Sequence, residues 1–481
     1  MVAVWQRWRW HLAIAAVVVG MRVRFLWTPI TSDEGGYLSV ARYWSRGATL
    51  YREAWVDRPQ GLLVLFRGLN VVGLDSPFGV RLLAIAAGLV GAFSCASIAS
   101  TLVGRRAYVP AGLITGVLLG VPQYEGFIAN AELLSGAIGA SGLAMVLGAV
   151  WGGRSGSART LAVAGAVSGY ALLTKQSAFD TVAIAGVVLA ASAVRRTPGA
   201  AVRLAAYAGG VAAMVALAAI HGALTGWSRW WFAVAGYRLG HRSVLETADW
   251  AKFRETLAIV APIVGPAVLI GIGLLIAVRR SVSLRAIAVV CGWLAFSVVA
   301  FLAGGLFHRH YWVLLMFPLG TQLGLAAARP ARRAWGALAV AAIVVVPLAY
   351  TVRAIGLPRD RVGRELSGDG RFRADEAIAH WYRDHRTDRS QEIYALCASA
   401  GLYGNVDSNA PYPYLWFLNI QDIPGAKQQL TELLAGPRAP TFVALYQAPD
   451  ACDRSGALGE TVRANYRQVA VIERVPVMQH R

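Results

Sequence analysis

The sequence predicts a mainly α-helical, polytopic membrane protein with a small soluble α/β domain at its C-terminus. The 481 residues are 56% hydrophobic, which is more than an ordinary soluble protein of this length contains. Apolar runs long enough to cross a bilayer as helices recur along the first part of the chain. Beyond about residue 356 the composition becomes polar. We therefore predict a membrane domain over residues 1–355 and a soluble domain over residues 356–481.

Hydrophobic runs indicate about eleven membrane-spanning helices. The first run follows a positively charged N-terminus, and no convincing cleavage site comes after it, so we expect an uncleaved span and not a signal peptide. Two runs between residues 160 and 194 are short, and one broken span there would invert all later segments. The predicted spans cover residues 11–28, 78–103, 107–122, 132–151, 160–174, 177–194, 203–222, 256–278, 284–304, 311–328 and 334–352.

The distribution of charge assigns each loop to a side of the membrane. The formal net charge is +20, but the arginines form short clusters between apolar runs, so we predict no nucleic acid partner. Cytoplasmic loops are enriched in positive residues. With a cytoplasmic N-terminus, every cytoplasmic loop is arginine-rich, so the acids, histidines and tryptophans, and the soluble domain, face the other side. The cytoplasmic arginines are Arg105, Arg106, Arg154, Arg159, Arg195, Arg196, Arg203, Arg279, Arg280, Arg285, Arg332 and Arg333.

The first extracytoplasmic loop, from about residue 31 to 77, is long and partly amphipathic. Apolar and aromatic side chains follow helical spacing over residues 37–44, and the stretch GLLVLFRGLNVVG at 61–73 is mostly apolar. Neither stretch is long enough to cross the bilayer. Both fit helices that lie in the plane of the interface, with a plain structured loop as the alternative.

The C-terminal part has the pattern of an α/β domain. The segments EIYALC, TFVALY and RQVAVIERV are typical of strands, and the stretches between them fit helices. Cys397 and Cys452 both lie in this part. A disulfide between them requires an oxidising compartment, and the sequence leaves that pairing open. It contains no Cys-x-x-Cys metal pattern.

Asp33 and Glu34 form a pair of adjacent carboxylates just outside the first span. A carboxylate at this boundary can take the proton of an acceptor hydroxyl as a new bond forms. We predict both as catalytic-site residues and expect one to act as the base, because neighbouring side chains need not face the same way. The alternative is a helix N-cap, in which Ser32 or Asp33 caps a helix that begins near Gly35.

Basic side chains elsewhere in the outer loops are candidates for binding a phosphate. Arg58 could hold a phosphate or form a local ion pair with Asp57 in a solvated turn. Lys175, between two apolar runs, either pairs with an anion or extends to the interface. The stretch GLFHRHYW is either a group of basic side chains that binds phosphate or an interfacial aromatic belt. Its histidine spacing does not favour a metal pair. That stretch contributes His308, Arg309, His310 and Tyr311.

Glu132 begins a predicted span in the stretch NAELL. An acid in the first turn of a helix is stabilised by the helix dipole, which is the simpler interpretation of this residue. The other interpretation is that Glu132, together with Asp57, positions a sugar or an acceptor.

Several of these stretches resemble one family in the same order along the chain. SDEGGYLSVARYWSRGATLYREAWVDRPQGLLVL resembles the first extracytoplasmic loop of polytopic glycosyltransferases related to protein O-mannosyltransferases and lipid A aminoarabinose transferases. YEGFIANAELL, LLTKQSAF and FHRHYWVLLMFPLG are similar to later landmarks of that group. The resemblance covers about residues 10–330. The family usually has Lys-Pro-Pro where this chain has Arg58-Pro59-Gln60, which keeps the charge but changes its geometry.

The resemblance implies the large C-type glycosyltransferase (GT-C) membrane fold. Its members move a sugar from a polyprenyl-phosphate carrier to an acceptor at the extracytoplasmic face. Asp33 corresponds to the family's loop acid, with Glu34 beside it. Arg58, Lys175 and residues 308–311 correspond to positions near the carrier phosphate. In a multi-pass protein of the bacterial plasma membrane, we expect Asp33 to deprotonate the acceptor and the sugar to invert.

The partners expected from this resemblance are a polyprenyl-phosphate sugar, the lipid bilayer and an acceptor that is a glycan, a lipid or a protein. Fixed cations can stabilise a leaving phosphate, so we expect no essential metal or other cofactor. The competing hypothesis is a transporter or flippase of a lipid-linked sugar. Transporters place functional charges in mid-membrane on broken helices. Here most charged groups lie at the ends of spans, which favours the enzyme.

Overall fold

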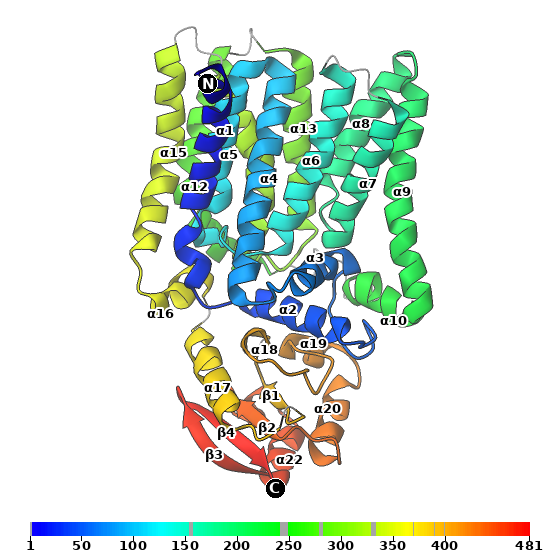
Figure 1. The fold of residues 1–481 in the computed structure, drawn as a ribbon, viewed down its shortest axis with the longest axis vertical. Helices are drawn as coiled ribbons and strands as arrows, with labels where there is room; N and C mark the ends of the chain where they lie inside the picture. The colour runs from blue at the N-terminus through cyan, green and yellow to red at the C-terminus, as the bar shows by residue number, and fades with distance from the viewer. Residues whose placement is uncertain are drawn as a thin grey trace.

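The computed structural model describes residues 2–152, 157–240, 249–278, 282–328, 333–368, 370–388, 390–398 and 400–481. Within them, each predicted span coincides with a helix of one bundle, and the N-terminus lies at the end opposite the C-terminal domain (Figure 1). The bundle helices are α1 (Val2–Gly20), α4 (Pro77–Val103), α5 (Tyr108–Gly120), α6 (Ala131–Trp151), α7 (Ala158–Thr174), α8 (Asp180–Val194), α9 (Ala200–Thr225), α12 (Trp250–Val278), α13 (Leu284–Leu302), α14 (Val313–Ala327) and α15 (Arg333–Ile355).

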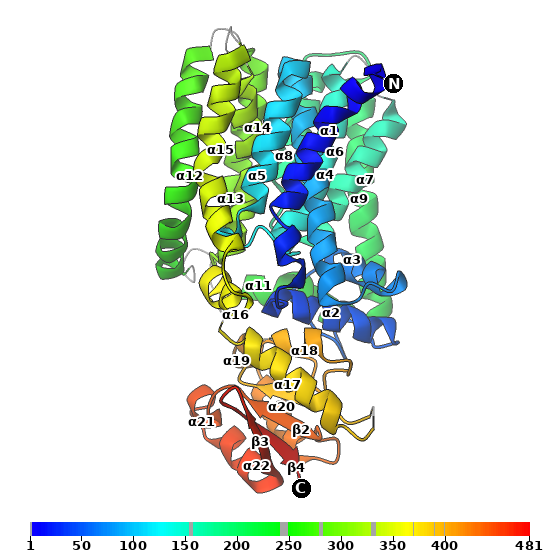
Figure 2. The same cartoon turned by 60° about the vertical axis from the view of Figure 1, so that its left-hand side comes forward.

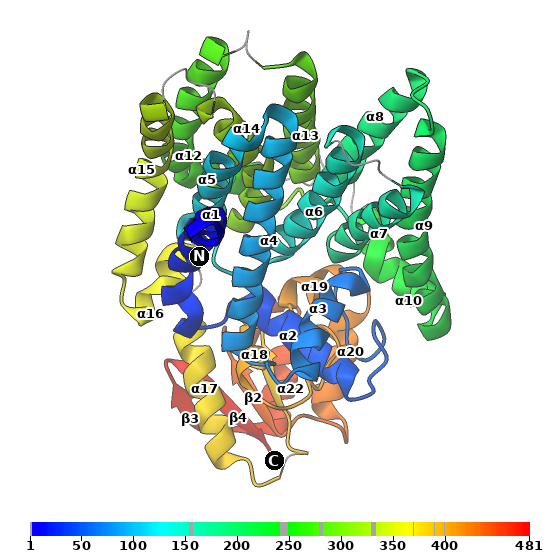
Figure 3. The same cartoon turned by 45° about the horizontal axis from the view of Figure 1, so that its top comes forward.

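Seven helices among the described residues are long and apolar enough to cross a membrane: α1 with its 3-10 extension (Val23–Trp27), α4, α6, α9, α12, α13 and α15. The other four, α5, α7, α8 and α14, are shorter. The chain is thus a multi-pass membrane protein, as predicted, and the count of eleven spans stays a prediction. Figure 3 shows α6–α9 on one side of α4 and α12 and α15 on the other.

The arginine-rich connections gather at one end of the bundle. The links from α4 to α5 and from α8 to α9 lie at the same end as the N-terminus, away from the C-terminal domain (Figures 1 and 2). This arrangement agrees with the loop pattern that the arginines predict, and the side of the membrane stays a prediction. Four of those arginines, Arg154, Arg279, Arg280 and Arg332, lie outside the described residues.

Two helices lie across the other end of the bundle, between it and the C-terminal domain (Figure 1). They are α2 (Ser32–Ser45) and α3 (Gln60–Val71), so the first outer loop contains the two helices expected there. The prediction that Ser32 or Asp33 caps the first of them is wrong. Thr31 is the N-cap, because its hydroxyl accepts from the Glu34 amide while the Glu34 carboxylate accepts from the Thr31 amide, forming a capping box.

The C-terminal domain contains a four-stranded sheet with the order β1-β2-β4-β3. Strands β1 (Ile393–Leu396) and β2 (Phe442–Leu445) are parallel, and β4 (Val475–His480) runs antiparallel to β2 and to β3 (Tyr466–Ile472). The prediction of an α/β domain is correct. Its helices are α17 (Phe372–His385), α18 (Gly401–Asn405), α19 (Phe417–Asp422), α20 (Ala426–Ala435), α21 (Pro449–Cys452) and α22 (Ala457–Asn465).

The segment between the two parts packs on the bundle. Helix α16 (Arg359–Val362) and the π-helix Gly363–Ser367 bury Val362 and Leu366 against Phe25, Phe127 and Ile128. The residues that pack on the sheet therefore come only after this segment.

Glycines let the C-terminal domain approach α2 closely. A Cβ added at Gly35 would lie 3.0 Å from the Gly401 carbonyl oxygen, and one at Gly404 would lie 2.6 Å from the Gly35 Cα. Side chains larger than hydrogen would therefore separate α2 from α18. Next to this contact, the rings of Tyr37 and Trp416 lie 5.9 Å apart. The soluble domain is thus mounted directly on the helix that carries Asp33.

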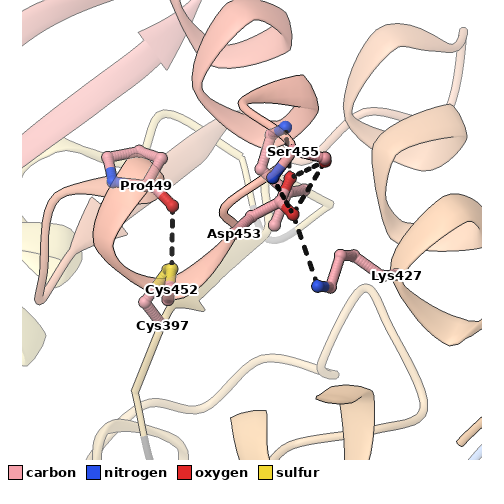
Figure 4. The surroundings of a disulfide bond; sticks show 7 residues. Cys397, Lys427, Pro449, Cys452, Asp453 and Ser455 are labelled. Carbon is pink, nitrogen blue, oxygen red and sulfur yellow. Dashed lines mark hydrogen bonds and ion pairs between the residues drawn. A yellow bond between two sulfur atoms is a disulfide. The ribbon is translucent and has the colours of Figure 1, made fainter.

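Cys397, just after β1, and Cys452, at the end of α21, form a disulfide with their Cα atoms 6.0 Å apart (Figure 4). The cysteines are 55 residues apart in the sequence. A crosslink that closes a loop of this length restricts the unfolded chain. The bond joins the segment between β1 and α18 to the end of α21 within the same domain.

Replacing both cysteines, as Cys397→Ser/Cys452→Ser, is expected to destabilise the C-terminal domain by about 2–4 kcal/mol, because the unfolded chain regains the entropy of an open loop. The measurement is the thermal unfolding midpoint of the detergent-solubilised protein beside the wild type. Under non-reducing denaturing conditions, the wild type should expose only the thiols of Cys95 and Cys291. Reactive thiols at all four cysteines would contradict the disulfide.

Candidate active site

Charged side chains and one tyrosine from seven segments meet at the end of the bundle that faces α2 and α3. They come from α2, the loop before α3, the α5–α6 connection, the start of α6, the α7–α8 connection, α11 (Tyr237–Gly240) and the 3-10 helix Arg309–Trp312 before α14. We call this set the ion cluster. Its members are Asp33, Asp57, Arg58, Glu125, Glu132, Lys175, Arg238, His310 and Tyr311.

Lys175 is a buried cation of the ion cluster. It is the C-cap of α7, where a cation is favoured by the helix dipole. Its ammonium forms an ion pair with Glu132, and both side chains are buried. The same nitrogen lies 3.9 Å from the centre of the Tyr311 ring. Burial lowers the pKa of Lys175 to about 8, against the attraction of Glu132.

Two arginines share one carboxylate at the edge of the ion cluster. Arg58 Nη1 donates to Asp57 Oδ2 at 2.8 Å, and Arg238 pairs with the same oxygen. Burial raises the pKa of Asp57, but the attraction of Arg238 and Arg58 outweighs it and the net direction is down. Arg58, Arg238 and Asp57 therefore carry a net charge of +1 between them. Arg58 Nε is also buried with no hydrogen-bond partner among the described residues.

His310 faces three carboxylates. Its Nδ1 lies 2.7 Å from Glu125 Oε2, and its Nε2 lies 3.8 Å from Asp33 Oδ2 and 3.9 Å from Glu132 Oε2. Burial opposes a charge on the imidazole, but Glu132, Glu125 and Asp33 raise the pKa of His310 to about 9. The neighbouring His308 ring is stacked 5.6 Å away. Burial and the charge of His310 lower the pKa of His308 to about 4.

Asp33 is the most accessible acid of the ion cluster. Its side chain is 31% exposed, compared with 13% for Asp57, 10% for Glu125 and 2% for Glu132. It lies in the first turn of α2, and the helix dipole favours its negative charge. Of the four carboxylates, it is therefore the one most open to a molecule from outside the protein.

Two of the predicted site residues point away from the ion cluster. Glu34 is fully buried on another face of α2, where its Oε1 accepts from the Ala129 amide at 2.9 Å and lies 3.1 Å from Arg81 Nη1. Arg309 donates to the carbonyl oxygens of Glu365 and Leu366, at 3.1 and 2.8 Å. Both side chains hold neighbouring segments together in this structure.

The ion cluster contains two residues that the sequence did not single out. Glu125 lies in the stretch YEGF, and a carboxylate next to aromatic residues in an outer loop was the available signal. Arg238 comes from the long connection between α9 and α12. Only tertiary packing distinguishes it from the other arginines there, because its partner Asp57 is 181 residues away in the sequence.

Among the described residues, no group of three or more histidine, cysteine, aspartate or glutamate side chains could hold a metal ion. The acids of the ion cluster instead have Lys175, Arg58, Arg238 and His310 as partners.

Comparisons with known proteins identify similar structures but no sequence relative. No protein-family model and no curated protein matches the chain. ArnT from Cupriavidus metallidurans in the apo state is 18% identical, with a TM-score of 0.65 over 97% of this chain and 96% of its own. The same protein bound to undecaprenyl phosphate is 17% identical, with a TM-score of 0.61 and the same coverage.

A third similar structure is the oligosaccharyltransferase of Archaeoglobus fulgidus, tethered with an acceptor peptide. It is 12% identical to this chain, with a TM-score of 0.53 over 96% of this chain and 73% of its own. At such identities the similarity concerns the fold, and the side chains of the ion cluster have to be interpreted on their own chemistry.

Proposed function

Because the chain has the fold of the GT-C glycosyltransferases, we propose that it transfers a sugar from a polyprenyl-phosphate carrier to an acceptor hydroxyl. The donor sugar is a hexose or a pentose, and the acceptor is a glycan, a lipid or a protein. The reaction inverts the anomeric configuration. In this proposal the protein acts at the extracytoplasmic face of a bacterial plasma membrane.

One observation carries the proposal: buried cations that can still bind an anion lie beside a single accessible carboxylate. Arg58 and Arg238 share Asp57, so one of their charges is free to meet a phosphate. The Arg58 Nε donor has no protein partner, and buried donors without a partner are costly unless a ligand or water satisfies them. Lys175 adds a third cation. Asp33 is the most exposed carboxylate of the ion cluster.

The mechanism follows from this placement. The acceptor oxygen attacks the anomeric carbon while Asp33 takes its proton. The bond between the anomeric carbon and the phosphate oxygen breaks on the opposite side, and its electrons leave with the phosphate. Arg58, Arg238 and Lys175 stabilise the charge that grows on the leaving group. One displacement of this kind inverts the sugar, and it requires no metal ion because the cations of the chain supply the stabilisation.

Glu34 and Arg309 are assigned positioning roles in this proposal. Glu34 completes the capping box of α2 and pairs with Arg81, so it fixes the turn that presents Asp33. Arg309 secures the loop of residues 308–311 to the segment that includes Glu365 and Leu366. Neither has a polar atom directed at the place where the donor phosphate would bind.

The disulfide supports the proposed orientation. Structural disulfides persist in oxidising compartments and are rare in the cytosol, and the bond between Cys397 and Cys452 lies in the domain mounted on α2. Helices α2 and α11, which both contribute to the ion cluster, lie at the same end of the bundle as this domain (Figure 2). The acceptor would therefore meet the donor on the extracytoplasmic side.

Replacing Arg238 by glutamine is expected to weaken binding of a polyprenyl phosphate by about tenfold or more, because a charge-assisted contact to phosphate contributes about 1.5–3 kcal/mol. The measurement is the dissociation constant for undecaprenyl phosphate in detergent micelles. Arg229→Gln, an exposed arginine of α10 (Trp227–Trp231) in the same connection, is the matched control. A wild type that binds no polyprenyl phosphate would contradict the proposed donor.

A further inference from the structure

We infer that Glu125 and His310 form a positioning pair for Asp33, in which the imidazolium of His310 orients the base and Glu125 holds the imidazolium. This inference rests on the proposed function. The sequence predicts that His310 binds the donor phosphate. The inference instead gives His310 the task of orienting Asp33. It also assigns a task to Glu125.

The two ring nitrogens of His310 connect it to Glu125 on one side and to Asp33 on the other. Glu125 Oε2 lies 2.7 Å from Nδ1 of His310, which is a hydrogen bond. That bond fixes the orientation of the ring, so Nε2 on its other side faces Asp33 Oδ2 at 3.8 Å. A contact of this length closes to a direct hydrogen bond with a small movement of the accessible Asp33 side chain. Such contacts often tighten when substrate binds.

Glu125 adopts a backbone conformation that is unusual for its residue type. Its φ angle is +61°, in the left-handed region that L-residues rarely occupy. The following residue is Gly126, and the Glu125 carbonyl accepts from Asn130 Nδ2 at 3.3 Å. Ser367, in the segment after α15, also donates to the Glu125 carboxylate. Strained backbone of this kind occurs at functional sites, and here it directs the carboxylate at His310.

The charges around His310 favour its protonated form. Asp33 faces it from α2, Glu125 from the α5–α6 connection and Glu132 from α6. Lys175 already pairs with Glu132, so Asp33 and Glu125 are the two carboxylates left for the imidazolium. On its own segment, His310 is flanked by the rings of His308 and Tyr311. Both ring nitrogens of His310 therefore face carboxylates, and neither is free for a phosphate.

The first test separates positioning of the base from binding of the donor. His310→Gln removes the charge and should lower kcat by on the order of 100-fold, because a misplaced catalytic group costs about that much. The KM for the polyprenyl-phosphate sugar should change by less than about threefold. A rise in donor KM with kcat unchanged would overturn the inference and return His310 to the phosphate site.

The second test uses Glu125→Gln, which keeps the shape of Glu125 and removes its charge. His310 then loses its proton at lower pH, so transfer should decline with rising pH about one unit earlier than in the wild type. Lys175 also titrates in this range, but it pairs with Glu132 and not with Glu125, so its contribution is common to both proteins. Glu432→Gln changes an exposed residue of α20; it is the control and should leave the profile unchanged.

The outcomes distinguish this inference from the proposed function. If the wild type transfers sugar and Glu125→Gln lowers the rate at every pH without moving the profile, Glu125 has only a structural role and the inference fails. If the wild type transfers no sugar from any polyprenyl-phosphate donor, the proposed function fails. If Glu125→Gln does not purify as a folded protein, the kcat and KM values of His310→Gln decide.

Discussion

Asp33→Asn is expected to lower the rate of sugar transfer by about 10²- to 10⁴-fold, which is the range over which a general base contributes. The amide keeps the size of the side chain but cannot take the acceptor proton. Asp33 is the most accessible acid of the ion cluster, so its loss should change the thermal unfolding midpoint little. The measurement is kcat with a labelled donor, beside the unfolding midpoint of the same preparation.

Two matched variants make the Asp33 result specific. Asp450→Asn removes an exposed carboxylate in the C-terminal domain, which pairs with the exposed Arg463, and should transfer sugar at the wild-type rate. Glu34→Gln changes the neighbouring acid, which is fully buried against Arg81. It should chiefly lower the unfolding midpoint, because Arg81 loses its partner. Wild-type transfer by Asp33→Asn would remove Asp33 from the mechanism.

The ion pair between Glu132 and Lys175 is expected to give the largest effect on stability. Glu132→Gln leaves the buried ammonium of Lys175 without its charged partner, and breaking a buried pair in this way costs about 3–5 kcal/mol. Adding Lys175→Met removes the orphaned charge, so the double variant should recover most of the lost stability. Its activity should not return, because Lys175 is then missing from the donor phosphate site.

The measurement for this pair is the thermal unfolding midpoint of the single and double variants, together with their transfer rates. Removing the exposed pair of Arg359 and Glu376 is the control, and it should cost less than about 1 kcal/mol. Equal unfolding midpoints for Glu132→Gln and the double variant would show that the pair does not act as a unit. Full transfer by the double variant would remove Lys175 from the donor site.

The sequence predicts the helices well because their signal is local. Each apolar run corresponds to one bundle helix, and the amphipathic pattern over residues 37–44 and 61–73 identifies α2 and α3. The sequence does not predict strand β4, because the turn that joins β3 to β4 lacks the usual glycine or asparagine. Glu473 and Arg474 form that turn, with φ angles of +46° and +68°, in a type of turn that normally favours Asn-Gly.

The site is less predictable because its contacts are distant in sequence. The sequence identifies Asp33, Arg58, Lys175 and His310 as charged residues of the outer loops, and the fold brings all four into the ion cluster. It cannot show that His310 pairs with Glu125, 185 residues earlier. It also cannot show which face of a helix each of two neighbouring side chains occupies, since successive residues of a helix point about 100° apart.

The most direct measurement of the central claim is transfer from a panel of radiolabelled polyprenyl-phosphate sugars by the purified protein, with envelope extract as acceptor and EDTA present. We expect at least one donor to give a labelled product and a free polyprenyl phosphate, with the product formed equally well without EDTA. Binding of labelled donors without turnover of any of them would contradict the enzyme and favour a transporter of a lipid-linked sugar.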